Sequence, residues 1–152
     1  MSRLICFASD YGYADDFAGV CRAVIARLAP DALVIDVTHG LPQRDVLAGA
    51  LVLRNTLPYM PDHAVHLTVV DPGVGGPRRP VALRSAGDRL FVGPDNGLLT
   101  LAAEADGGIA EAYLLTNQEL WLAPLSATLI WGTCSSQQYL SLIHISEPTR
   151  PY

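Results

Sequence analysis

The fold is decided in residues 4–37, which read LICFASDYGYADDFAGVCRAVIARLAPDALVIDV. Residues 4–8 form a short apolar run followed by turn residues, which is typical of a buried strand. Apolar side chains in residues 15–28 recur at three- and four-residue steps, which predicts an amphipathic helix that starts with acidic residues at its positive end. Residues 32–37 are apolar and β-branched and predict a second strand. A strand–helix–strand unit of this kind pairs its strands in parallel.

The rest of the chain continues the same alternation. We expect a second helix, a third strand, a hairpin, a short helix and a last strand, at residues 45–57, 65–70, 80–84 with 89–92, 98–105 and 112–115. This order predicts an α/β fold, with a mostly parallel sheet and helices on both faces.

Composition excludes several classes of protein. The 152 residues are 50% hydrophobic and 16% charged, with a net charge of -5. This composition is too apolar for a disordered chain, and the charge is too acidic for extensive electrostatic binding to nucleic acid or anionic membranes. No apolar run is long enough for a membrane span, and the N-terminus lacks the pattern of a signal peptide. An odd number of cysteines without metal spacing indicates reduced thiols and a cytoplasmic protein: Cys6, Cys21 and Cys134.

The composition changes abruptly at Thr128. Residues 1–127 contain 19 alanines and residues 128–152 contain none, and residues 140–152 resemble the translation of a sequencing-library adapter. We therefore expect an incomplete α/β domain at residues 1–128 and a non-native, disordered tail at residues 129–152. A genuine linker or a lineage-specific tail is the alternative.

Four polar clusters follow predicted strands. Ligands of open parallel sheets bind beyond the carboxyl ends of the strands, so we expect all four clusters along one edge. They are Ser9-Asp10-Tyr11-Gly12, Thr38-His39, residues 71–78 (DPGVGGPR) and Gly93-Pro94-Asp95-Asn96-Gly97.

Each candidate residue in these clusters has a functional and a structural interpretation. Asp10 is placed to accept two hydrogen bonds from a vicinal diol such as ribose, or to cap its own turn. Asp15 either holds a ligand ammonium or complements the helix dipole. Asp71 and Arg78, joined by a loop rich in glycine and proline, either polarise a nucleophilic water or form a structural salt bridge. On turn chemistry alone, Asn96 belongs to a simple turn.

We predict neither a metal site nor a phosphate loop. His63 and His66 are separated by an odd spacing at the start of a strand, which sends their side chains to opposite faces. Residues 73–76 are glycine-rich, but they lack a Gly-Lys-Ser/Thr ending and no predicted helix follows directly.

The motifs, taken in order, resemble those of the S-adenosylmethionine (SAM) hydroxide adenosyltransferases, adenosine-forming SAM hydrolases related to the fluorinase and chlorinase. The resemblance covers residues 4–128 and rests on residues 9–12 with Asp15, residues 34–39 (VIDVTH), residues 69–75 (VVDPGVG) and residues 93–97 (GPDNG). It implies an N-terminal α/β domain, a C-terminal β-barrel domain that is absent here, and a homotrimer with sites between subunits.

The resemblance also implies a reaction and a role for each candidate. Activated water attacks the 5′ carbon of SAM and releases adenosine and L-methionine, with SAM as substrate and no cofactor. Asp71 and Arg78 match two members of the catalytic set, and Asp10 matches the aspartate that binds ribose. Asp15 matches the position near the methionine end, and Asn96 lies in a motif that lines the nucleoside site.

One departure from the family pattern limits this expectation. Relatives continue from a Ser-x-Thr motif like residues 126–128 into Phe-His-Gly-Arg-Asp, which supplies the catalytic histidine, whereas this chain continues Leu-Ile-Trp-Gly. We therefore expect the full-length parent to hydrolyse SAM and this chain to be inactive. Alternatives are a nucleoside- or SAM-binding module without turnover, a structural protein, and a halogenase. The halogenases of the family lack an aspartate at the position of Asp71.

Overall fold

The structure, a computed structural model, describes residues 4–73 and 77–117. The predicted tail at residues 129–152 lies outside the described residues, as do Cys134 and the motif at residues 126–128. The expectations about these segments stay predictions.

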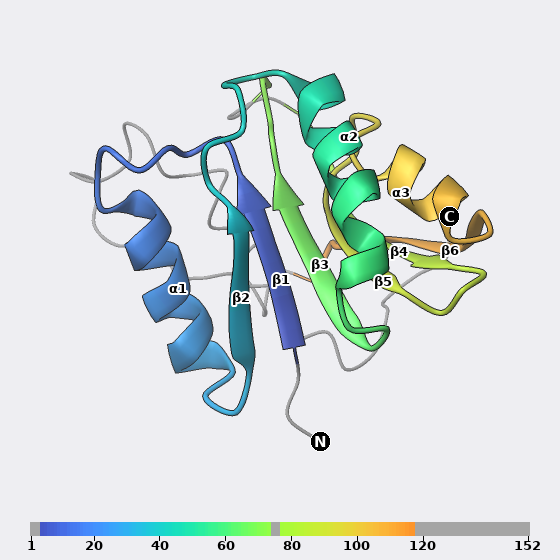
Figure 1. The fold of residues 1–152 in the computed structure, drawn as a ribbon, viewed down its shortest axis with the longest axis horizontal. Coiled ribbons are helices and arrows are strands. Elements are labelled where there is room, and N and C mark those ends of the chain that lie inside the picture. Colours follow the sequence, from blue (N-terminus) through green and yellow to red (C-terminus); the bar gives the residue numbers. More distant parts are fainter. Residues whose placement is uncertain (1–3, 74–76, 118–152) are drawn as a thin grey trace.

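Six strands form one sheet in the order β2-β1-β3-β5-β4-β6 (Figure 1). β1 pairs in parallel with β2 and β3, and β3 pairs in parallel with β5. Among the strands of the described residues, β4 alone runs opposite to the other five, because it forms a hairpin with β5 and an antiparallel pair with β6. The predicted mostly parallel sheet is confirmed. The strands are β1 (Leu4–Ser9), β2 (Leu33–Thr38), β3 (Ala64–Val69), β4 (Pro80–Ser85), β5 (Leu90–Pro94) and β6 (Ile109–Leu114).

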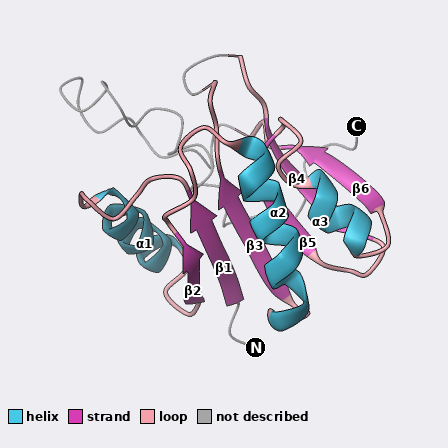
Figure 2. Ribbon diagram, turned by 45° about the horizontal axis from the view of Figure 1, so that its top comes forward, coloured by secondary structure: helices cyan, strands magenta, loops and turns pink. Residues whose placement is uncertain are grey.

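Helices cover both faces of this sheet, as predicted (Figure 2). α1 (Phe17–Leu28) buries Cys21 and Ile25 in a core that includes Phe7 of β1. α2 (Val46–Thr56) and α3 (Thr100–Ala105) pack on the opposite face in a second core that includes Ala8. Successive residues of a strand point to opposite faces, so the neighbours in β1 divide between the two cores. A 3₁₀ turn, η1 (Leu57–Tyr59), follows α2 directly.

Several elements begin at other residues than predicted, for local reasons. α1 begins at Phe17 rather than at residue 15, because the Asp15 carboxylate accepts a hydrogen bond from the backbone N–H of Phe17. β6 begins three residues early, at Ile109, because pairing with Ser85 of β4 extends the strand to the glycine turn before it. Propensity within a single segment does not show such pairing.

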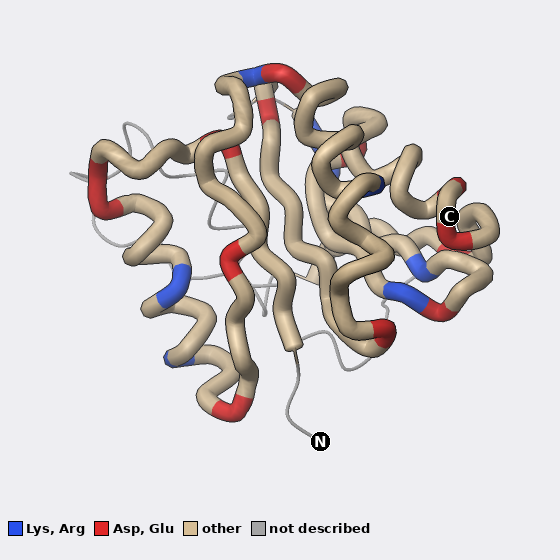
Figure 3. The backbone as a smooth tube through the Cα atoms, viewed as in Figure 1, with Lys and Arg blue, Asp and Glu red and all other residues tan. Residues whose placement is uncertain are grey.

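Charged residues are dispersed over the described part of the chain (Figure 3). Acidic positions lie in the loop that leads into α1 and at the upper edge in this view, where the parallel strands end. Within residues 4–73 and 77–117, no helix is both long and apolar enough to cross a membrane.

Candidate functional site

The four polar clusters meet at one edge of the sheet, as predicted. They follow β1, β2, β3 and β5, which all run in the same direction (Figure 1). The backbone N–H of Asp10 donates to the carbonyl of Val69 across 3.2 Å, so the ends of β1 and β3 remain in contact where the candidate residues begin.

Asp71 and Arg78 form a close pair just beyond β3. Asp71 Oδ1 accepts hydrogen bonds from Arg78 Nη1 at 2.7 Å and from the backbone N–H of Gly73 at 3.0 Å. The Asp71 side chain is 1% exposed and that of Arg78 is 25% exposed, so a buried carboxylate is neutralised by a guanidinium that reaches the surface. A Cβ atom on Gly73 would clash with Arg78 Nη2, so any side chain at position 73 would displace the guanidinium from its present place.

Asn96 ties the end of β5 to the end of β3. Its Nδ2 donates to the carbonyl of Val70 at 2.9 Å, and its Oδ1 accepts from the N–H of Leu98 at 3.1 Å. Gly97 has a φ of 90°, so the predicted Asn-Gly turn is confirmed. The amide of Asn96 therefore holds its own loop beside Asp71, and contact with a nucleoside stays a prediction.

Asp10 is half-buried, and the β2–α2 loop fixes its orientation. Its Oδ2 accepts a hydrogen bond of 2.9 Å from the backbone N–H of Arg44. Arg44 has a φ of 62°, a left-handed conformation that costs about 1–2 kcal/mol for a residue with a side chain. Strain of this kind persists where the surrounding structure enforces it and often marks functional sites.

Asp15 lies just before α1, whose N-cap residue is Asp16. Asp15 Oδ1 accepts from the N–H of Phe17 at 3.1 Å, at an exposed position. This bond shows that the Asp15 side chain contacts the N-terminal end of α1, where the structural interpretation placed it. Its predicted role near the methionine end of SAM is not tested by this geometry.

Sequence reasoning placed His39 at this edge but assigned it no role. The structure makes it a junction: its Nδ1 lies 2.8 Å from Ser9 Oγ, its carbonyl accepts from Gly12 N–H at 2.7 Å, and its N–H donates to Tyr13 Oη at 2.7 Å. The signal in the sequence was a histidine two residues after the second predicted strand.

The two cysteines of the described residues are buried and unreactive. Burial raises the pKa of the Cys21 thiol to about 12 and raises that of Cys6 above its usual value. A thiol nucleophile is therefore excluded at these positions. Within the described ranges, no group of three or more His, Cys, Asp or Glu side chains could hold a metal ion. His63 is exposed, whereas His66 is buried in β3.

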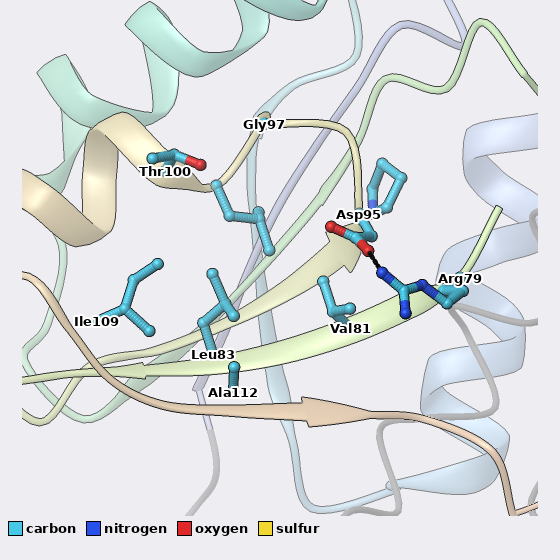
Figure 4. Close-up of a pocket in the computed structure, with 10 residues that line it drawn as sticks. Arg79, Val81, Leu83, Asp95, Gly97, Thr100, Ile109 and Ala112 are labelled. Atoms are coloured by element: carbon cyan, nitrogen blue, oxygen red, sulfur yellow. Dashed lines mark hydrogen bonds and ion pairs between the residues drawn. The ribbon is translucent and has the colours of Figure 1, made fainter. Parts of the chain in front are cut away.

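A cavity of about 290 Å³ lies between α3 and strands β4 to β6, and the predicted site residues do not line it (Figure 4). Its floor is apolar, including Val81 and Leu83, and one end is formed by Arg79, whose Nη2 lies 2.6 Å from Asp95 Oδ2. Arg79 follows Arg78 in sequence and Asp95 precedes Asn96. This ion pair therefore joins the segment that carries Arg78 to the loop that carries Asn96.

Comparison with known proteins confirms the resemblance inferred from the motifs. Residues 5–131 match the SAM hydroxide adenosyltransferase N-terminal domain. An (R)-S-adenosyl-L-methionine hydrolase from Salinispora arenicola is 57% identical over 124 residues, which are 82% of this chain and 47% of that protein. A fluorinase from Actinoplanes sp. is 29% identical over 77% of this chain and 46% of its own length.

A solved structure supports the fold. The crystal structure of an uncharacterized conserved protein from Thermotoga maritima superimposes with a TM-score of 0.78 at 34% identity, over 95% of this chain and 55% of that one. The chain thus spans about half the length of the relatives it matches.

Proposed function

Because the chain belongs to the SAM hydroxide adenosyltransferase family, we propose that its full-length protein hydrolyses SAM to adenosine and L-methionine. The observation that carries the proposal is the contact between Asp71 and Arg78 at the end of β3. A carboxylate paired with a guanidinium at the strand end is suited to orient and polarise a water.

The proposed reaction makes modest chemical demands. The water oxygen bonds to the 5′ carbon of the ribose as the bond from that carbon to sulfur breaks. The bonding electron pair passes to sulfur, which leaves as the neutral thioether of methionine, and the attacking water loses one proton. No general acid is needed for this leaving group and no cofactor enters the proposal. Most of the rate enhancement then comes from alignment of water and ribose.

The other candidate residues receive binding roles in the proposal. Asp10 accepts hydrogen bonds from the ribose diol, with its carboxylate already oriented by Arg44. Asp15 lies near the methionine end and Asn96 beside the nucleoside. The family likeness further leads us to propose a homotrimer and a cytoplasmic location, and the two cysteines of the described ranges, which are both free thiols, agree with the latter.

The test is adenosine release from SAM, followed by chromatography. We expect turnover by the full-length protein and none by the 152-residue chain, which lacks the family's Phe-His-Gly-Arg-Asp stretch. Asp71→Asn should lower turnover by about 10²–10⁴-fold, which is the usual contribution of general acid–base catalysis. Asp88→Asn in the distant β4–β5 hairpin is the matched control and should leave turnover unchanged. Full activity of the Asp71→Asn variant would contradict the proposal.

Two other outcomes would redirect the assignment. Adenosine binding in calorimetry without turnover by the full-length protein would indicate a nucleoside-binding module. Chloride-dependent formation of a 5′-halogenated nucleoside would indicate a halogenase.

A further inference from the structure

His39 joins two loops of the candidate site through bonds from its side chain and its backbone. The β1–α1 loop carries Asp10, and the β2–α2 loop carries Arg44, which donates to Asp10. We propose that His39 is a positioning residue that fixes the orientation of Asp10 toward the ribose of the substrate. The inference rests on the proposed function, in which Asp10 binds the ribose diol.

The side-chain contacts of His39 form a chain with one consistent direction. His39 Nε2 lies 3.3 Å from Asp36 Oδ1 without forming a hydrogen bond, and the nearby negative charge favours the tautomer that carries its proton on Nε2. Nδ1 is then an acceptor, and the Ser9 hydroxyl donates to it across 2.8 Å. The Ser9 oxygen in turn accepts the N–H of Tyr11, at 3.4 Å. The chain therefore ends on the backbone of the residue that follows Asp10.

Asp36 is anchored in its own right. Its Oδ2 lies 3.1 Å from Arg22 Nη1 on α1, and its side chain is 32% exposed. The contact of Asp36 with His39 Nε2 is off the line of the N–H bond, so it acts as an electrostatic contact that selects the tautomer.

Burial holds the imidazole of His39 in one place. Its side chain is 3% exposed, and the ring packs edge-on against Phe7, with centroids 4.7 Å apart. Tyr13 covers the ring from outside, at 6.0 Å between centroids. Ser9 is 0% exposed, so its hydroxyl is enclosed together with the ring.

The backbone of His39 reinforces the same loop. Its carbonyl accepts from Gly12, which has a φ of 85°, a conformation that favours glycine. Ser9 also accepts, through its carbonyl, the N–H of Leu41 at 3.3 Å. Asp10 is thus bracketed by His39 bonds on both sides, at Ser9 and at Gly12.

The test compares two ligands in calorimetry with the full-length protein: adenosine, and 2′,3′-dideoxyadenosine, which lacks the diol. We expect His39→Leu and Ser9→Ala each to weaken adenosine binding about tenfold, the size of one misplaced hydrogen bond to a charged group, with little change for the dideoxy ligand. His39→Asn places an amide near the position of Nδ1 and should restore adenosine binding to within about threefold.

If His39 had a purely structural role, its loss would weaken the binding of both ligands alike. Ser9→Ala is the smaller change, so equal weakening of both ligands in this variant would overturn the inference even if His39→Leu failed to fold. Asp10→Asn separates the two proposals. If Asp10→Asn keeps the preference for adenosine over the dideoxy ligand, the ribose role of Asp10 is wrong and the inference falls with it. If Asp10→Asn loses the preference but Ser9→Ala and His39→Leu keep it, only the role of His39 is wrong.

Discussion

Replacement of Arg78 by methionine should destabilise the fold through the carboxylate that it leaves behind. The Asp71 side chain is 1% exposed, and the substitution removes the hydrogen bond that its Oδ1 accepts from Arg78 Nη1. Removal of one partner of a buried pair costs about 3–5 kcal/mol, and because the Arg78 side chain is 25% exposed we expect about 2–3 kcal/mol. For a domain of this size that lowers the Tm by roughly 10 °C.

The pairwise contribution follows from a double-mutant cycle measured by urea unfolding of the 152-residue chain at pH 7. Asp71→Asn keeps an acceptor for Gly73 and leaves a partly solvated guanidinium, so it should cost about 1 kcal/mol. The double variant removes both charges and should cost about 1.5 kcal/mol, less than the two single changes together, which gives a coupling of about 2 kcal/mol. A loss below about 0.5 kcal/mol for Arg78→Met, or additive changes, would refute the reasoning.

Three further measurements check other parts of the structure. Gly73→Ala places a methyl group against Arg78 Nη2, so it should cost about 1 kcal/mol in urea unfolding but almost nothing in the Arg78→Met background. An equal cost in both backgrounds would contradict the contact. Burial lowers the pKa of His66 from 6.5 to about 4, so the unfolded chain binds a proton that the folded chain does not between these pH values. The free energy of unfolding should therefore fall as the pH drops from 6.5 to about 4, by up to about 1.4 kcal/mol per pH unit. His66→Phe should flatten this dependence of stability on pH and leave the slope above pH 7 unchanged. Gly49→Ala should cost about 1–2 kcal/mol of stability because its Cβ would lie 2.8 Å from the side chain of Leu98. Gly19→Ala in α1 has open space around it and should gain about 0.5–1 kcal/mol. Similar shifts of the Tm in both variants would refute the packing argument.

The sequence by itself determined the features that local pattern controls. Apolar periodicity located every strand and α-helix of the described residues to within a few positions but did not predict the 3₁₀ turn η1, and the alternation of these elements predicted the mostly parallel sheet with helices on both faces. It also placed four polar clusters on one edge, because parallel strands share the direction of their carboxyl ends. Both interpretations of Asp71 and Arg78 place the two side chains in contact, which a short loop of small and rigid residues made reachable, and the catalytic role of the pair stays a prediction.

Only the tertiary structure decided which partners lie across the strands. The bond between Ser9 and His39 joins residues 30 apart, and the bond from Arg44 to Asp10 joins residues 34 apart. The position of β4 between β5 and β6 is likewise set by pairing with a strand that comes later in the chain. Such contacts depend on the order of the strands in the sheet and on the packing that buries the side chains. Neither leaves a periodic signal in a single segment of sequence. The sequence therefore identified the residues of the candidate site, and the packing of the sheet determined what holds them in place.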